Sequence, residues 1–170
     1  KESDKINDNK GTTFTVTEIG AEVNYDCKDI TSITLPQTIE KIGSGVFKDA
    51  KIKKIYIPKS VKDISHTIWV TVSNIPEVKV HSENPYFESD ANGVLYTIGK
   101  EELRSVPSNI MTKVTGDTYT IDSHVTSITV GAFAVAPAYR FGKSRRNRLA
   151  FHCRYTYVGG ICDGCRQCKI

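Results

Sequence analysis

The chain has 170 residues, of which 39% are hydrophobic and 25% charged, a composition that excludes a disordered polymer and allows one continuous core. Every apolar run is shorter than the roughly 18 residues that span a membrane, so no transmembrane segment is expected. The formal net charge of +4 arises at the C-terminal end, because residues 140–170 hold 8 basic and 1 acidic residue, against 15 and 18 in residues 1–139. A nucleic-acid-binding protein carries its basic patch on the folded body, so nucleic acid is not expected as a partner.

Residues 1–24 are predicted to form a polar N-terminal segment with an incomplete first repeat or cap. The chain begins with a polar run that reaches Lys10. Tyr25 stands five residues before Ile30, as Phe47 stands five before Ile52, which makes Tyr25 a candidate for the end of an incomplete repeat. Residues 25–136 are predicted to be the repeat domain.

The strongest pattern is an internal repeat with a period of about 22 residues, which lies in the range of solenoid proteins. The segments that begin at Ile30 and Ile52 superpose without a gap at seven positions. The pairs are Ile30 and Ile52, Ile33 and Ile55, Leu35 and Ile57, Pro36 and Pro58, Ile39 and Val61, Ile42 and Ile64, and Phe47 and Trp69. A fixed period predicts stacked coils of a solenoid, whereas strands of a β-sandwich, the alternative, would not keep one offset.

Each repeat predicts a short strand followed by a return across the core. Ile33 and Leu35 alternate with polar residues, which is typical of a strand with one buried face. Pro36 would end that strand, because proline cannot donate to a β-ladder. One such coil cannot bury its apolar edge alone, so Ile33 is expected to stack on Ile55, and Phe47 on Trp69, in a parallel arrangement.

Later segments repeat parts of the same pattern. Ile75, Val78 and Val80 keep the spacing of Ile52, Ile55 and Ile57. A third copy keeps the intervals of Leu35, Ile39, Ile42 and Phe47 at Ile121, Val125, Ile128 and Phe133. Between them, Asn92-Gly93 is a strong hairpin-turn signal, followed by alternating Val94, Tyr96 and Ile98.

These segments resemble the repeat of the BspA-like leucine-rich-repeat proteins, the Treponema pallidum type. The resemblance lies in ITSITLPQTIEKIGSGVF and, for a longer variant repeat with a hairpin, in the segments 84–87, 92–96, 102–103 and 106–107. It covers roughly Tyr25 to Ala136. It implies an α/β-type, β-rich leucine-rich-repeat solenoid, with short parallel strands in a curved right-handed superhelix and one inserted β-hairpin. Ala50 stands where the family often has Cys, so the core is expected to be apolar rather than disulfide-linked.

The resemblance also implies a function and a location. Its members are mostly surface or secreted proteins of host-associated bacteria and some protists, and several are adhesins. We therefore expect a fragment of an extracellular or cell-surface protein that binds a protein ligand, with host extracellular matrix or another cell surface as candidate partners. The alternative is a structural spacer or truncated remnant with no ligand of its own.

Residues 137–170 form a basic, Cys-containing tail that departs from the repeat. Six of the seven Arg residues lie from Arg140 onward. The tail is either an atypical terminal cap or the product of a reading-frame shift in a repeat gene. Its cysteines are Cys153, Cys162, Cys165 and Cys168. They are interpreted as incidental thiols, with disulfides and a zinc site as alternatives, and Cys27 makes the total odd.

No pattern of catalytic residues is found, so an enzyme is not expected. Ser65-His66 and Ser123-His124 are adjacent pairs without a surrounding nucleophile elbow. The pair Glu101-Glu102 is interpreted as solvated charge. Neither a phosphate-binding loop nor a dinucleotide fingerprint occurs, so no cofactor is predicted.

The predicted ligand surface consists of the outward-facing residues of the strands. If Ile33 and Leu35 point inward, their neighbours and the equivalents in later coils point outward along one concave face. These residues are Ser32, Thr34, Lys54, Tyr56, Glu77, Lys79, Thr118 and Thr120. Tyr56 is the one aromatic among them, and we expect it to anchor a ligand together with Lys54 and Lys79.

Overall fold

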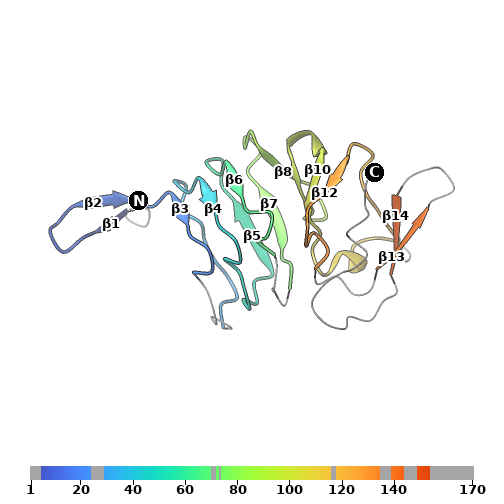
Figure 1. The fold of residues 1–170 in the computed structure, drawn as a ribbon, viewed down its shortest axis with the longest axis horizontal. Helices are drawn as coiled ribbons and strands as arrows, with labels where there is room; N and C mark the ends of the chain where they lie inside the picture. The colour runs from blue at the N-terminus through green and yellow to red at the C-terminus, as the bar shows by residue number, and fades with distance from the viewer. Residues whose placement is uncertain are drawn as a thin grey trace.

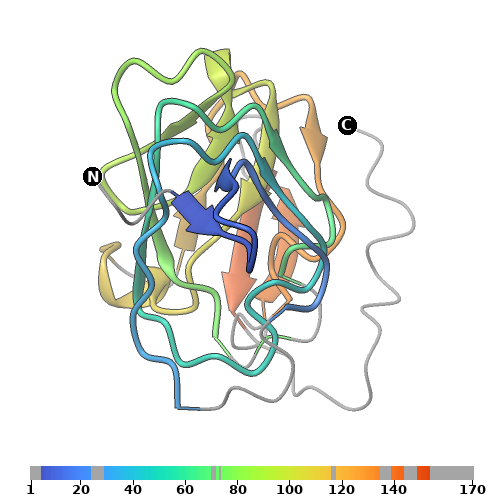
Figure 2. The same cartoon turned by 90° about the vertical axis from the view of Figure 1, so that its left-hand side faces the viewer.

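The computed structural model is strand-rich and elongated, with its strands following one another along the long axis (Figure 1). Viewed from the N-terminal end, successive coils trace overlapping outlines (Figure 2). The structure describes residues 5–23, 29–69, 72, 74–115, 118–134, 139–143 and 149–153, and within them the backbone alone for residues 118, 139–143 and 149–153. The β-rich character is therefore confirmed, whereas the helical layer that an α/β class implies is not found in this part of the chain.

An antiparallel hairpin precedes the first coil. Its strands are β1 (Lys5–Asn7) and β2 (Thr13–Thr15), with Ile6 opposite Phe14. Asp8 closes the turn, because its Oδ1 accepts hydrogen bonds from the backbone N–H groups of Lys10 and Thr12, each at 2.8 Å. The hairpin projects from the N-terminal end of the body (Figure 1).

Two parallel sheets are built from strands that alternate along the chain. One contains β3 (Glu18–Ile19), β4 (Lys41–Ile42) and β6 (Asp63–Ile64). The other contains β5 (Lys54–Ile57) and β7 (Glu77–Val80). Ile42 lies opposite Ile64, so the offset predicted from the sequence is confirmed here. Ile42 also lies opposite Ile19, at a slightly longer interval along the chain, so a coil exists that the fixed offset did not detect.

The strand predicted at Ser32–Leu35 is not formed, and this prediction was wrong. Leu35 is buried as expected, but Ile33 is only partly buried against the core that contains Ile55. One repeat upstream, the residues around Asn9 belong to the β1–β2 turn and offer no strand to pair with. The coil still contacts its successor, since Lys51 N–H donates to the Ile30 carbonyl at 2.8 Å.

The predicted hairpin is confirmed. It belongs to a third sheet, in which parallel and antiparallel pairs are mixed. It pairs β8 (Phe87–Ser89) with β9 (Leu95–Thr97), and β9 pairs with β10 (Glu102–Ser105), both antiparallel. A 3-10 turn at Ile98–Lys100 links β9 to β10, so Ile98 is exposed rather than part of the strand. The third repeat copy then adds β12 (Ser127–Ile128) parallel to β10, with Ile128 opposite Leu103.

The last described strands connect the tail to the repeats. A second 3-10 turn at Ile110–Thr112 leads to β11 (Thr118–Thr120). This strand pairs antiparallel with β14 (Leu149–Cys153), which in turn pairs with β13 (Tyr139–Lys143). Tyr25, Cys27, Cys162, Cys165 and Cys168, and the side chain of Cys153, lie outside what the structure describes.

Two clusters of buried apolar side chains form the core. The first extends from Leu35 to Leu95 and the second from Val94 to Ala132, so they meet at neighbouring residues of the inserted hairpin. Each fully buried aliphatic side chain contributes about 1.5–3 kcal/mol relative to exposure. Phe47 and Trp69, predicted to stack, do so in the first cluster.

Polar side chains join each coil to the one before it. Thr38 Oγ1 donates to the Val16 carbonyl at 2.7 Å, and Ser60 Oγ donates to the Ile39 carbonyl at 2.6 Å. Asn84 Nδ2 donates to the carbonyls of Pro58 at 2.9 Å and Val61 at 3.0 Å. Each donor lies about one repeat downstream of its acceptor, so these bonds hold the stack in register.

Candidate protein-binding surface

The structure gathers four of the eight predicted binding residues into one patch. Lys54 lies opposite Glu77, and Tyr56 opposite Lys79, on the outer face of the β5–β7 sheet. Their neighbours in sequence, Ile55, Ile57, Val78 and Val80, are buried, which forces these four side chains to the other face. We call Lys54, Tyr56, Glu77 and Lys79 the β5–β7 strip.

The other predicted residues are not joined to this strip by strand pairing. Ser32 and Thr34 are exposed, but they lie in the irregular segment that precedes Leu35. Thr120 is exposed on β11, whose described partner is β14 and not β7. The backbone of Thr118 belongs to the same strand.

Tyr56 presents the aromatic surface of the strip. Its side chain is 41% exposed, and its ring meets His81 edge-on, with centroids 6.3 Å apart and an interplanar angle of 64°. The contact limits the rotation of an exposed aromatic side chain, so less entropy is lost when a ligand covers it.

Glu77 is paired with side chains of the protein, so its charge is not free to bind a ligand. Its carboxylate accepts a hydrogen bond from Asn109 Nδ2 at 2.8 Å and lies 2.9 Å from Lys113 Nζ and 3.4 Å from Lys54 Nζ. The hydrogen bonds from Asn109 and then Lys113 lower the pKa of Glu77 to about 2. Sequence reasoning missed Asn109 and Lys113, because no local pattern places a loop from so far downstream against β7.

The turn of the inserted hairpin forms a wall beside β7. The Gly93 carbonyl accepts a hydrogen bond from Val78 N–H at 3.0 Å, and Ser89 Oγ accepts one from Val80 N–H at 3.0 Å. Gly93 has φ +81°, and a Cβ there would lie 2.9 Å from the Glu77 Cβ, so only glycine fits this approach. The outer edge of β7 is thereby capped by the hairpin.

A cleft of roughly 460 Å³ lies between the strip and this wall. Both of its cations, Lys54 and Lys79, and one of its two anions, Glu77, belong to the predicted site. The lining residues are Lys54, Glu77, Val78, Lys79, Val80, Ser89, Asp90, Ala91 and Gly93.

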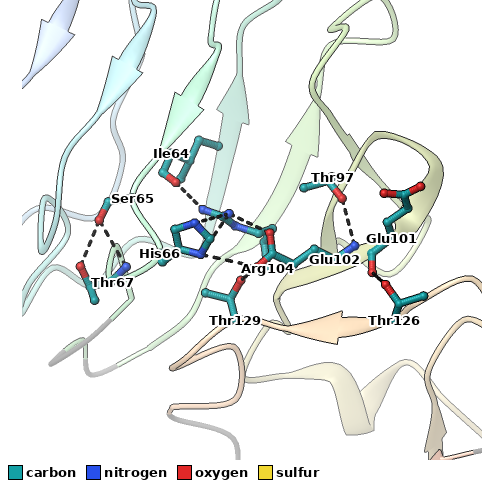
Figure 3. A network of polar contacts seen from close by, with 10 residues as sticks. All are labelled: Ile64, Ser65, His66, Thr67, Thr97, Glu101, Glu102, Arg104, Thr126 and Thr129. Atoms are coloured by element: carbon teal, nitrogen blue, oxygen red, sulfur yellow. Dashed lines mark hydrogen bonds and ion pairs between the residues drawn. The ribbon is translucent and has the colours of Figure 1, made fainter. Parts of the chain in front are cut away.

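A second polar cluster surrounds Arg104, and Figure 3 shows it between β6 and β10. Arg104 is only 6% exposed. Its guanidinium donates to the Ile64 carbonyl and, at 3.0 Å, to Glu102 Oε2, and it lies 3.3 Å from the His66 ring. Thr129 Oγ1 donates to Glu102 Oε1 at 2.9 Å. Glu102 is therefore bound within a network, and its interpretation as a solvated charge was wrong.

The two adjacent serine–histidine pairs, for which no catalytic role was expected, have their histidines turned to other partners. Ser65 Oγ contacts Thr67 Oγ1 at 3.0 Å, while His66 turns to Arg104 and Glu102 (Figure 3). His124 Nδ1 lies 2.8 Å from Asp122 Oδ1, and Lys100 and His124 hold the pKa of Asp122 well below its ordinary value. Both histidines thus contact side chains other than the hydroxyl of the adjacent serine.

The described residues contain neither a metal-binding cluster nor a membrane-spanning helix. No group of three or more His, Cys, Asp or Glu side chains in this part of the chain could hold a metal ion. Among the same residues, no helix is long and apolar enough to cross a membrane.

The fold and its surface define a strand-rich leucine-rich-repeat protein. The family model of the BspA type Leucine rich repeat region matches residues 9–92, in 6 copies, and this part of the chain belongs to that family. The match starts upstream of Tyr25, where the resemblance was expected to begin, in agreement with the stacking of Ile19 on Ile42. A search of the curated proteins finds no match.

Two solved structures match this chain over part of their length. A leucine-rich repeat protein from Eubacterium ventriosum is 24% identical with a TM-score of 0.49, over 72% of this chain and 44% of that one. The pneumococcal vaccine antigen PcpA is 20% identical with a TM-score of 0.56, over 69% of this chain and 34% of that one. The chain thus spans less than half the length of either protein.

Proposed function

We propose that the chain is a non-enzymatic, secreted or cell-surface module that binds a protein ligand through the β5–β7 strip. The observation that carries the proposal is the exposed Tyr56 beside two lysines on a sheet that burial and strand pairing hold rigid. Aromatic side chains on rigid elements supply large contact area at low entropic cost and dominate many interfaces. The leucine-rich-repeat family supports a role in protein interaction.

The proposal includes a location and a shape. The pneumococcal relative is named a vaccine antigen, which is in keeping with an extracellular or surface protein. We propose that the coils continue as a curved right-handed solenoid with the strip on its concave face, and that its repeat domain includes residues 25–136. Host extracellular matrix and the surface of another cell are the candidate sources of the ligand.

Surface plasmon resonance against a panel of purified matrix proteins tests the function. The full chain should bind at least one of them saturably, and Tyr56→Ala should weaken that binding at least about tenfold, as expected of an aromatic hot spot. Tyr86→Ala is the matched control, because Tyr86 is 46% exposed and lies outside the strip.

The alternative function is a structural spacer without a ligand. The ion pairs that link successive coils, such as Lys62 with Glu40 at 2.9 Å, would serve a spacer equally well. Absence of saturable binding to every protein of the panel favours the spacer and overturns the binding module. Equal loss in Tyr56→Ala and Tyr86→Ala keeps the module but removes the strip as its site.

A further inference from the structure

We propose that the cleft between the β5–β7 strip and the hairpin turn binds an extended acidic peptide segment with carboxylates two residues apart. This inference rests on the proposed protein-binding function and adds the chemistry of the partner. The cleft is lined by two lysines and two carboxylates, which differ in their partners within the protein.

The two acidic side chains of the cleft already have partners within the protein. Glu77 is bound by Asn109 and Lys113. Asp90 Oδ1 accepts hydrogen bonds from the backbone N–H groups of Asn92 and Val94, each at 2.9 Å. Both carboxylates are held by the protein but keep their negative charge, so the lining of the cleft carries two positive and two negative side chains.

The two lysines of the cleft remain available. Lys54 is 77% exposed and lies at the long distance of 3.4 Å from Glu77, and one ammonium has three donors. Lys79 is exposed, and no carboxylate of the described residues pairs with it. Lys51 and Lys53, both exposed, add positive charge at the start of β5. Together with Lys113, these lysines outnumber the two carboxylates of the cleft, and this excess of positive charge favours an anionic ligand.

The strand register sets the spacing of that ligand. Lys54 pairs with Glu77 and Tyr56 with Lys79, so Lys54 and Lys79 are diagonal neighbours across the sheet. Neighbouring strands lie about 4.8 Å apart and positions two residues apart are separated by about 6.6 Å along a strand, so these two backbone positions are about 8 Å apart. In an extended peptide, alternate side chains point to the same side and are separated by about 6.6 Å. Two carboxylates at positions i and i+2 thus match the two ammonium groups.

A peptide fits the cleft better than a nucleic acid. Tight binding of a nucleic acid needs several Lys or Arg contacts to consecutive phosphates. The cleft supplies two exposed lysines, of which Lys54 lies 3.4 Å from Glu77, and Asp90 stands beside them. A peptide can place neutral residues opposite those carboxylates, and Tyr56 at the end of the strip can cover an apolar side chain.

The test uses the full chain labelled with ¹⁵N and three short peptides of equal length. The probe is Gly-Thr-Glu-Thr-Glu-Thr-Gly, blocked at both ends. The first comparison peptide, Gly-Thr-Thr-Glu-Glu-Thr-Gly, has the same charge with adjacent carboxylates. The second replaces both Glu by Gln. The probe should shift the backbone amide signals of residues 54–57, 77–80 and 89–93 with the lowest Kd of the three.

Charge variants locate the interaction. The double variant Lys54→Gln, Lys79→Gln should weaken binding of the probe about fivefold to tenfold, the loss expected for two exposed ion pairs. The matched control, Lys41→Gln with Lys62→Gln, removes the same charge from lysines paired with Glu18 and Glu40 and should bind like the parent. Raising the salt from about 50 to about 300 mM should weaken the probe, because exposed charges are screened.

Several outcomes overturn the proposal. Equal affinity of the two Glu peptides would mean general charge attraction without the inferred spacing. Equal loss in both double variants would place the contact outside the cleft, and tighter binding of an oligothymidylate would assign the cleft to nucleic acid. If a matrix protein binds through Tyr56 but is not displaced by the probe, the acidic-peptide inference fails while the proposed function stands.

Discussion

Phe47 and Trp69 stack across neighbouring coils, with ring centroids 5.4 Å apart and planes inclined by 22°. They occupy the same position in successive repeats, and both are buried. The pair therefore joins the sequence period directly to the packing of the first core cluster. The Nε1 of Trp69 is buried without a hydrogen-bond partner in the described part of the chain, so its contribution is one of packing.

Replacing Trp69 by alanine should destabilise the protein by about 3–5 kcal/mol, because it leaves a large cavity against Phe47. Trp69→Phe should cost less than about 1.5 kcal/mol, since it keeps the aromatic stack and removes an unpaired N–H group. Urea unfolding followed by circular dichroism measures both. Equal losses in the two variants would show that the stack is not what stabilises this position.

Asn84 should be among the most sensitive polar positions. It is buried, donates to the carbonyls of Pro58 and Val61, and accepts from the N–H groups of Tyr86 and Phe87, both at 2.9 Å. Asn84→Ala should cost about 2–4 kcal/mol, because several buried groups lose their partner.

Asn84→Asp, which is similar in size but cannot donate, should be destabilised too. Ser82→Ala, at an exposed position two residues away, should change stability by less than about 0.5 kcal/mol. Thermal unfolding of the three variants makes the comparison. A stable Asn84→Ala would mean that β8 does not depend on this connection to the preceding coil.

The contacts of Arg104 should be needed to keep β10 packed against β6. Arg104→Met removes the donor to the Ile64 carbonyl and leaves Glu102 with an unpaired charge, at a cost of about 3–5 kcal/mol. Lys62→Met, which breaks the exposed pair with Glu40, should cost less than about 1 kcal/mol. Hydrogen exchange should show increased opening of residues 102–105 in Arg104→Met, and unchanged protection there would contradict the assignment.

Glu77 should make stability depend on acid pH. Its pKa is about 2 in the folded protein against an ordinary value of 4.5, so its contribution is complete above pH about 4.5 and is lost as the pH falls toward 2. The difference in unfolding free energy between the parent and Glu77→Gln should therefore shrink over that interval.

Asn109→Ala supplies the control for this pH dependence. It removes the first cause of the low pKa of Glu77, so the acid-induced loss, which begins near pH 4.5 in both proteins, should be smaller and complete at a higher pH than in the parent. Denaturant titrations at half-unit pH steps measure the effect. If the difference in unfolding free energy between the parent and Glu77→Gln stays constant from pH 5 to pH 2, Glu77 is not held by these partners.

The parts of the fold that repeat could be predicted, because burial recurs at a fixed interval. Ile42 and Ile64 were aligned from sequence and lie opposite each other. Asn92-Gly93 predicted the hairpin turn, which needs the positive φ that Gly93 adopts. Ile19 escaped the same reasoning, because the interval between it and Ile42 is longer than the fixed offset.

The remaining features depend on contacts between distant segments. Lys54, Tyr56, Glu77 and Lys79 could be placed on one face by alternation, but their division into free and bound charges could not. Glu77 is bound by a loop that arrives after the hairpin insertion. Arg104 looks like an exposed charge in sequence, whereas the structure buries it in contact with the Ile64 carbonyl of β6.

The side-chain bonds of Thr38, Ser60 and Asn84 all run in one direction, from a later coil to a main-chain carbonyl of an earlier one. Every coil possesses such a carbonyl whatever its side chains are. Recombination that deletes or duplicates a unit therefore rejoins a donor with an acceptor without any compensating substitution. Arrays of this kind can change length during evolution while each junction stays chemically complete.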